Sequence, residues 1–305
     1  MTATIDEPRP SGPMVWVRAA RPATLLACAV PVLVGSALAA SAGRLRLDAA
    51  LFALASAGMI QIGTNLYNDY EDFRRGADTS ARLGPARATQ RGWLAPGRVL
   101  AAAVACFALS IALGMVLVSI AGWPVLVIGL VSVLCGVAYT GGPLPLAYHG
   151  LGDVFVWVFF GIVAVCGTYF IQTEAVSWSV FLASNAVGAL ASAILVVNNL
   201  RDRVTDAAAS KRTLAVRFGA RAARIQYAMM VAFAFLAPAA GWAAGLVGPW
   251  WLLSLGALPL GLWEIRAIWR LDGAALNPHL GATARLELAF GLLLSIGIVL
   301  DGGGP

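Results

Sequence analysis

Long apolar segments separated by short polar ones recur along the whole chain. Each is close to the ~20 residues that an α-helix needs to cross a bilayer. They lie at about 22–40, 48–67, 99–119, 123–140, 151–172, 177–200, 225–246, 250–268 and 285–300. The pattern predicts an all-α integral membrane protein with about nine transmembrane helices.

Composition supports this prediction. Of the 305 residues, 60% are hydrophobic and 12% are charged, whereas soluble domains have about 25% charged residues.

The first residues contain Asp6 and Glu7 but no basic segment, which argues against a cleavable signal peptide. We expect a disordered cytoplasmic tail over 1–17 and a single transmembrane domain over 18–305. All four cysteines fall within predicted helices, which predicts small buried residues and no disulfide framework.

Two long polar loops are expected at 68–98 and 201–224, after the second and sixth helices. They contain six and seven basic residues, respectively. Loops rich in Lys and Arg stay in the cytoplasm, so both loops and the N-terminus are predicted there, and an odd number of helices places the C-terminus outside. The spacing of the loops also suggests two four-helix units plus one helix, with a site where the units meet.

The first of these loops opens with an acidic cluster. It reads Asn65-x-x-Asn68-Asp69-x-x-Asp72, and Asp78 follows six residues later. Carboxylates three or four residues apart share one face of a helix and can point at one site. Ionisable groups beside membrane helices are costly and usually mark function.

A matching cluster opens the second loop and reads Asn198-Asn199-x-x-Asp202-x-x-x-Asp206. Two carboxylate pairs with amide oxygens are suited to Mg²⁺, which is held by one or two carboxylates together with substrate phosphates. The nearby arginines and Lys211, the single lysine of the chain, suit a diphosphate. Arg21 is predicted to reach either lipid headgroups or this site.

Other interpretations remain open. The acids could form ion pairs at a solvated membrane interface, or line the path of a transporter or Mg²⁺ channel. Channel acids, however, are expected within spans or on both sides of the membrane. An alcohol phosphotransferase of phospholipid synthesis would need a different pattern of Asp-Gly and Ala-Arg residues, which this sequence does not contain. The sequence also lacks a stripe of basic residues interleaved with aromatic residues, the pattern that would indicate nucleic-acid binding.

A series of motifs extends from the second to the seventh helix. They are Gln61-x-x-x-Asn65-x-x-Asn68-Asp69-Tyr70-x-Asp72, Gly76-x-Asp78, Arg82-x-Gly84-Pro85-x-Arg87-x-x-Gln90, Tyr139-Thr140-Gly141-Gly142-Pro143, Gly150-Leu151-Gly152-Asp153, Asn198-Asn199-x-Arg201-Asp202 and Lys211-Arg212-Thr213-Leu214. In these motifs the chain resembles the intramembrane aromatic prenyltransferases of the UbiA superfamily, and within it the 1,4-dihydroxy-2-naphthoate polyprenyltransferases (MenA type). Asp153 stands where Glu is more often expected in this group.

The resemblance implies a Mg²⁺-dependent transfer of a polyprenyl group from polyprenyl diphosphate to 1,4-dihydroxy-2-naphthoate. Carbon dioxide and diphosphate are lost, and demethylmenaquinol or demethylmenaquinone forms in a bacterial cell (inner) membrane. Other acceptors of the superfamily, namely 4-hydroxybenzoate, homogentisate and haem, remain alternatives.

The resemblance also implies roles for individual residues. Asp78 would either assist metal binding or deprotonate the acceptor. The implied metal ligands are Asp69, Asp72, Asp202 and Asp206, and the implied catalytic residues are Asp78, Lys211 and Arg201. The implied substrate-binding residues are Asn65, Asn68, Tyr70, Arg82, Arg87, Gln90, Tyr139, Asn198, Asn199, Arg201 and Lys211.

Overall fold

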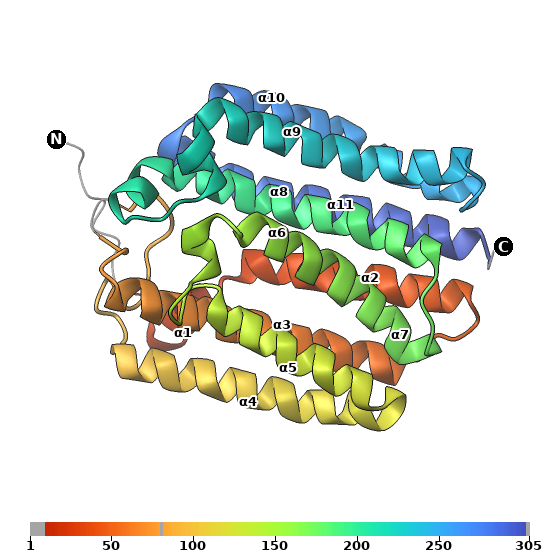
Figure 1. The fold of residues 1–305 in the computed structure, drawn as a ribbon, viewed down its shortest axis with the longest axis horizontal. Coiled ribbons are helices and arrows are strands. Elements are labelled where there is room, and N and C mark those ends of the chain that lie inside the picture. Colours follow the sequence, from red (N-terminus) through yellow and green to blue (C-terminus); the bar gives the residue numbers. More distant parts are fainter. Residues whose placement is uncertain (1–9, 80–81, 303–305) are drawn as a thin grey trace.

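Hydrophobic helices run side by side along one axis in a computed structural model of the chain (Figure 1), which describes residues 10–79 and 82–302. These residues contain no β-strand, as predicted. The long single helices are α2 (Pro22–Ser41), α3 (Leu47–Arg74), α4 (Pro96–Ala121), α5 (Trp123–Ala138), α8 (Trp178–Ala208), α9 (Leu214–Ala243) and α11 (Asn277–Leu300).

Two further spans are composite. The first joins α6 (Gly152–Val156), the π-helix η2 (Trp157–Cys166) and α7 (Gly167–Thr173), and the second joins the 3₁₀ helix η3 (Pro249–Ala257) to α10 (Leu258–Arg270). A short 3₁₀ helix, η4 (Gly273–Leu276), leads into α11. Within the described residues, eight segments are long and apolar enough to cross a membrane, and α5 is a shorter apolar helix of 16 residues. The protein is therefore a multi-pass membrane protein, and counting α5 gives the predicted nine.

Several helices continue beyond the predicted spans. Helix α3 runs on to Arg74 and α8 to Ala208, while α9 already begins at Leu214. The predicted loops over 68–98 and 201–224 are therefore too long, and both acidic clusters lie on the last turns of helices. Backbone hydrogen bonding does not depend on hydropathy, so a helix can continue past the point where its side chains become polar.

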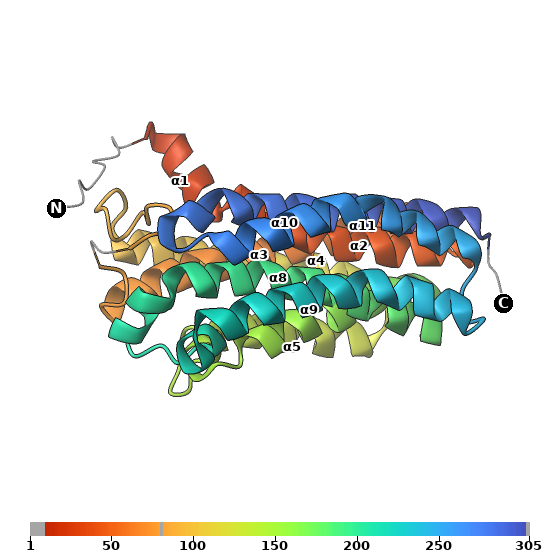
Figure 2. The same ribbon diagram turned by 90° about the horizontal axis from the view of Figure 1, so that it is seen from above.

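The predicted disordered tail over 1–17 is also too long. Residues 1–9 lie outside the described part, but Gly12–Ala20 form helix α1. Its buried Val15 and Ala19 pack with Leu66 of α3 and with Trp93. Figure 2 shows α1 at an angle to the bundle. Packing of this apolar face, which the run of prolines obscures in the sequence, stabilises the helix.

The largest buried cluster joins α2, α8, α9 and α11. Small residues allow the helices to approach closely. A Cβ atom on Gly188 of α8 would lie 2.6 Å from the carbonyl oxygen of Trp157 and 3.0 Å from the Cα of Gly161 in η2. This contact fixes the π-helix against α8.

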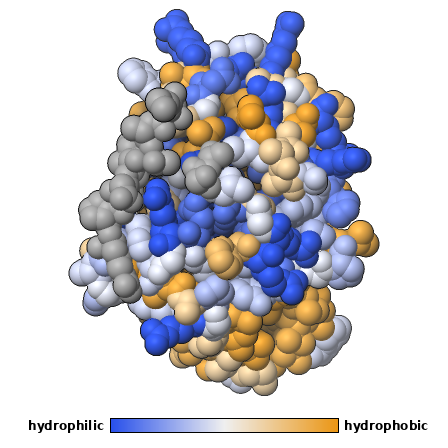
Figure 3. Space-filling view, turned by 90° about the vertical axis from the view of Figure 1, so that its left-hand side faces the viewer, coloured by the Kyte–Doolittle hydropathy of each residue, from blue (hydrophilic) through white to orange (hydrophobic). Residues whose placement is uncertain are grey.

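One end of the bundle collects the polar connections. The C-terminal ends of α3, α5 and α8 lie there with the segments 75–79, 82–95, 139–151 and 209–213, whereas α11 ends at the opposite end (Figure 1). This end is covered largely by hydrophilic side chains, with a hydrophobic area along its lower edge (Figure 3).

Candidate active site

A cavity of about 440 Å³ opens between two halves of the bundle, the first formed by α2–α5 and the second by the helices from α6 onward. Helices α2, α3, α4 and α5 border it on one side, and α6, η2, α7 and α8 on the other. Its lining on α3 extends from Ala53 to Asp72, which is about 28 Å at 1.5 Å per residue. Acids, amides and arginines line the end near Asp72. The remaining length is lined mainly by apolar side chains, among them Ile60, Leu117 and Phe159.

One face of α3 supplies the polar end of the cavity. Gln61, Asn65, Asn68 and Asp72 line it, as expected for positions three or four residues apart. Asp69 follows Asn68 by one residue and is rotated about 100° away from this face. Its carboxylate instead accepts hydrogen bonds from Thr89 Oγ1 and from the backbone N–H of Ala88 at 3.2 Å. Asp69 is therefore buried against a loop, away from the cavity.

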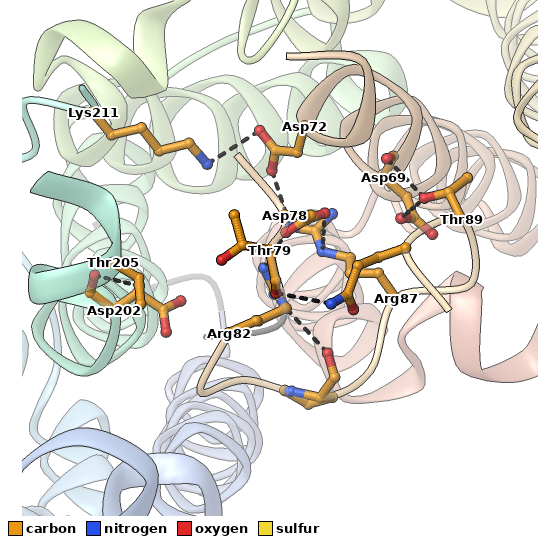
Figure 4. A network of polar contacts seen from close by, with 12 residues as sticks. Asp69, Asp72, Asp78, Thr79, Arg82, Arg87, Thr89, Asp202, Thr205 and Lys211 are labelled. Atoms are coloured by element: carbon orange, nitrogen blue, oxygen red, sulfur yellow. Dashed lines mark hydrogen bonds and ion pairs between the residues drawn. The ribbon is translucent and has the colours of Figure 1, made fainter. Parts of the chain in front are cut away.

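Asp72 joins the two halves of the bundle. Its Oδ1 lies 3.1 Å from Lys211 Nζ and accepts a hydrogen bond from Tyr148 Oη at 3.0 Å. Its Oδ2 lies 3.1 Å from Arg87 Nη2. Figure 4 shows Lys211 reaching Asp72 from the side of α8, while Asp69 points toward Thr89.

Asp78 is held by two arginines of the loop after α3. Arg82 Nη1 lies 2.6 Å from its Oδ1, and Arg87 Nε lies 3.3 Å from its Oδ2. Burial, followed by the charge of Arg87, lowers the pKa of Arg82. Burial also opposes the charge of Arg87, but Asp78, Asp72 and Asp69 outweigh it and raise the pKa of Arg87. The loop thus brings fixed positive charge to the cavity.

The second acidic cluster lies opposite. Asp202, Asp206, Asn198 and Asn199 of α8 all line the cavity, as their spacing of three and four residues predicts. Figure 4 shows Asp202 across a gap from the loop that bears Arg82.

Arg201 lies beside these residues without lining the cavity. It is buried, and its guanidinium contacts Asp202 at 2.8 and 2.5 Å, Asn198 at 2.6 Å and Asn277 of α11 at 3.1 Å. A Cβ on Gly84 would come within 2.7 Å of Arg201 Nη2, so the glycine allows the loop to close over the arginine. Arg201 therefore orients Asp202 and Asn198.

The predicted site residues fall into two groups. Those that line the cavity are Asn65, Asn68, Asp72, Asp78, Arg82, Arg87, Tyr139, Asn198, Asn199, Asp202, Asp206 and Lys211. Four do not. Asp69 and Arg201 are described above, Tyr70 packs with the apolar cluster under α1, and the Gln90 amide donates to the carbonyl of Thr79 at 2.8 Å.

Three contributors are missing from the sequence prediction, namely Tyr148, Thr89 and Asn277. Tyr148 lies in the 3₁₀ helix η1 (Leu146–His149) and binds Asp72 from 76 positions away, and no local pattern marks such a contact. Arg21 lines the cavity, and its Nη2 is buried with no hydrogen-bond partner among the described residues. Of its two predicted destinations, the structure therefore favours the site.

The side chains present fit a divalent cation that is shared with a bound anion. No group of three or more His, Cys, Asp or Glu residues within the described part of the chain could hold an ion by itself. Asp72, Asp202 and Asp206 nevertheless line one cavity, together with Asn68 and Asn198. This donor set suits Mg²⁺, which commonly takes one or two carboxylates together with phosphate oxygens and water.

Comparison with known proteins agrees with this geometry. A profile of the UbiA prenyltransferase family matches residues 28–281. The chain is 40% identical over 247 residues to a 1,4-dihydroxy-2-naphthoate octaprenyltransferase of Mycobacterium tuberculosis, covering 81% of this chain and 83% of that protein. It is 35% identical to the Escherichia coli protein of that name, covering 97% and 99%.

The fold is also similar to a structure of a UbiA homolog from Archaeoglobus fulgidus bound to DMAPP and Mg²⁺. That match has a TM-score of 0.65 at 17% identity and covers 92% of this chain and 99% of that one. The extent of the family match, together with relatives above 30% identity along most of the chain, shows that this protein belongs to the UbiA prenyltransferase family.

Proposed function

We propose that the protein transfers a polyprenyl group from polyprenyl diphosphate to 1,4-dihydroxy-2-naphthoate, with loss of carbon dioxide and diphosphate, in menaquinone biosynthesis. The observation that carries the proposal is one cavity that joins a charged end to a long apolar length. A polyprenyl diphosphate has the same division into a charged head and an apolar chain. The naphthoate acceptor follows from the relatives named for it.

The charged end would take the diphosphate. Arg82, Arg87 and Lys211 line it with guanidinium and ammonium groups, which suit phosphate oxygens. These cations form ion pairs with Asp72 and Asp78. Binding of an anion would compete with those ion pairs and release the carboxylates for other partners.

The released carboxylates would hold Mg²⁺. Asp72 from α3 and Asp202 and Asp206 from α8 are the proposed ligands, because all three line the cavity. The amide oxygens of Asn68 and Asn198 instead accept hydrogen bonds from Thr140 and Arg201 at 2.6 Å each. The bound cation would neutralise the charge that develops on the diphosphate as the allylic C–O bond breaks. Asp69 is left out of this set because it does not line the cavity and its carboxylate accepts hydrogen bonds from the loop instead.

The apolar lining would protect the reaction from water. Cleavage of the C–O bond leaves electron-poor character on the allylic carbon, which water would capture in an open site. The electron-rich naphthoate ring attacks this carbon, the new C–C bond forms, and the electron pair of the C–O bond leaves with the diphosphate. Loss of carbon dioxide from the ring then yields demethylmenaquinol.

The test uses purified protein in lipid nanodiscs with polyprenyl diphosphate, Mg²⁺ and acceptor labelled in its carboxyl group. We expect release of labelled carbon dioxide together with a prenylated naphthoquinol, and loss of both when EDTA is added. Turnover of 4-hydroxybenzoate in place of the naphthoate would contradict the proposed acceptor. Absence of transfer to any aromatic acceptor, combined with Mg²⁺ flux into liposomes, would favour a channel instead.

We also propose that the polar end faces the cytoplasm of a bacterial cell, in its inner membrane. This places the N-terminus inside and the C-terminus outside, and it rests on the basic residues of the segments that connect the helices at this end. A C-terminal alkaline phosphatase fusion should be active, and an N-terminal one inactive. The reverse result would overturn the orientation.

A further inference from the structure

Asp153 is a cavity carboxylate that the proposed binding of diphosphate and metal does not use. It lies in the first turn of α6, is only 4% exposed and lines the cavity. An acid in an otherwise apolar membrane segment is costly and usually marks function. Its position beside the site, without a place in the ionic network of Asp72 and Asp78, requires an explanation.

The partners of Asp153 are neutral. Gln226 Nε2 of α9 donates to its Oδ1 at 3.1 Å, and Ser192 Oγ of α8 donates to its backbone carbonyl at 3.1 Å. Among the described residues, no Lys or Arg forms a salt bridge with it, and its Oδ2 accepts no hydrogen bond. Asp153 is therefore held in place from two neighbouring helices, while one oxygen remains available to a molecule in the cavity.

The other candidate for a proton acceptor, Asp78, is engaged on both oxygens by Arg82 and Arg87. Asp78 therefore has no oxygen that is not already paired with a guanidinium group. Asp153, in contrast, has a single amide partner on Oδ1, which leaves its Oδ2 open to a hydroxyl group in the cavity. Of the two roles that the resemblance implies for Asp78, these contacts favour assistance in metal binding over deprotonation of the acceptor.

The surroundings of Asp153 suit a flat aromatic molecule. Phe155 and Phe159, two and six residues after Asp153, also line the cavity, and their rings are stacked at 5.8 Å between centroids with 8° between planes. Tyr139 is close as well, because its hydroxyl would lie only 3.1 Å from a Cβ atom placed on Gly152, the residue before Asp153. An aromatic ring at this place would lie between the charged end and the apolar length of the cavity.

We propose that Asp153 accepts the proton of a ring hydroxyl of the aromatic acceptor. The inference rests on the proposed function, because it assigns a role within that reaction. The O–H bond of the acceptor breaks and its proton moves to Asp153, while the oxygen electron pair enters the ring. The ring carbon bonds to the allylic carbon, and the electron pair of the allylic C–O bond leaves with the diphosphate. When carbon dioxide then leaves, its bonding electron pair passes through the ring to the oxygen, which takes the proton back from Asp153 and restores the hydroxyl of demethylmenaquinol.

The first test compares Asp153→Asn with Asp153→Glu. Asn keeps the shape and can still accept from Gln226, but it cannot take a proton. We expect kcat to fall about 100-fold in D153N, within the usual range for loss of a general base, and to recover largely in D153E. Affinity for Mg²⁺ and an unreactive prenyl thiolodiphosphate should be unchanged, because neither ligand uses Asp153.

The second test is the pH profile of the D153N defect. The groups that face Asp153 are Gln226 of α9, Ser192 of α8 and Tyr139 after α5. None of these described groups is a cation, so none could cause a pH dependence of the rate by losing a positive charge. The ratio of wild-type kcat to D153N kcat should fall as the pH rises toward the pKa of the acceptor hydroxyl, because solvent then removes the proton. Gln226→Leu serves as control and should show no such fall.

Distinct outcomes overturn different conclusions. Wild-type protein that leaves the naphthoate unreacted overturns the proposed function. Active wild-type protein with an equally active D153N variant overturns the role of Asp153. A D153N variant whose deficit is the same at every pH, or whose thiolodiphosphate affinity falls in parallel with kcat, shows a structural role and also overturns the inference.

Discussion

At the scale of single residues, the partner of each carboxylate distinguishes the acids that line the cavity from those that stabilise the fold. Asp72 meets Lys211, Arg87 and Tyr148 at the cavity surface. Asp69, only one turn earlier, is covered by the loop that carries Thr89. Two acids of the same motif therefore have different tasks, and substitution should separate them.

Asp72→Asn and Asp69→Asn form a matched pair on one helix. D72N should lower kcat about 100-fold or more, as loss of a group that stabilises developing charge commonly does, and should raise the Mg²⁺ concentration needed for half-maximal rate. D69N should stay within about tenfold of wild type but lose about 1–2 kcal/mol of stability, because it weakens two buried hydrogen bonds. Rates over a Mg²⁺ titration and thermal unfolding in detergent measure both effects. A larger loss of activity in D69N than in D72N would contradict this assignment.

Tyr148→Phe tests the hydrogen bond to Asp72 separately from the charges. Burial, followed by Asp72, raises the pKa of the Tyr148 phenol, so its neutral, donating form persists above pH 10, where an ordinary tyrosine is half ionised. The kcat/KM of Y148F should be about fivefold to tenfold lower than that of the wild type, which corresponds to the loss of one hydrogen bond. This factor should be the same from about pH 7 to pH 10. A factor that shrinks as pH rises would show that the phenol ionises in this range and would contradict the expectation.

At the scale of elements, close packing positions the wall of the cavity. The π-helix η2 carries Phe159 into the lining, and the contact of Gly161 with Gly188 holds this wall against α8. The rigid backbone on both sides leaves no room for a larger side chain.

Gly188→Ala should therefore destabilise the protein by about 1–3 kcal/mol through overpacking, because the new Cβ would meet the backbone oxygen of Trp157. Gly58→Ala on α3 is the control, since a Cβ there meets nothing within 4 Å and removal of a helical glycine stabilises by about 0.5–1 kcal/mol. Thermal unfolding in one detergent compares the two. Equal melting temperatures for both variants would show that the helix crossing can relax.

A second element, α11, contains a buried carboxyl group. Glu287 is fully buried, and neither of its side-chain oxygens has a hydrogen-bond partner among the described residues. Glu287→Met keeps a similar volume and removes a buried polar group that costs about 1–3 kcal/mol. We expect a higher melting temperature and unchanged kcat, because Glu287 does not line the cavity. A lower melting temperature would reveal a stabilising partner for this carboxyl group.

At the scale of the whole molecule, the site exists only because two halves of the bundle meet. Helix α3 provides Asn68 and Asp72, and α8 provides Asp202 and Asp206. The ion pair between Lys211 and Asp72 bridges the two halves directly. A ligand that binds both sides should therefore connect them further.

Mg²⁺ and diphosphate should accordingly bind with strong synergy. We expect Mg²⁺ affinity to rise at least about tenfold in the presence of a prenyl thiolodiphosphate, because phosphate oxygens complete the coordination. Asp72→Asn and Asp202→Asn should each abolish the synergy although they lie in different halves. Asp48→Asn, an exposed acid paired with Arg46, should leave it intact. Calorimetric titration measures this, and tight Mg²⁺ binding without the diphosphate would contradict it.

Local sequence patterns alone are enough to predict the spans, the acidic clusters and the family. Hydropathy reports which segments enter lipid, and a spacing of three or four residues reports which side chains share a helix face. These properties depend on neighbours along the chain, and for Asp202 and Asp206 they also identify the face that lines the cavity.

Only the tertiary structure decided which face of α3 turns to the cavity, and thereby set Asp72 and Asn68 apart from Asp69. The rotation of a helix about its axis follows from packing against other helices. Tyr148 and Asn277 reach the site for the same reason, across 76 positions in each case. The acidic clusters are thus a local property of the sequence, whereas the cavity and the single ligand set around it are properties of the packed bundle.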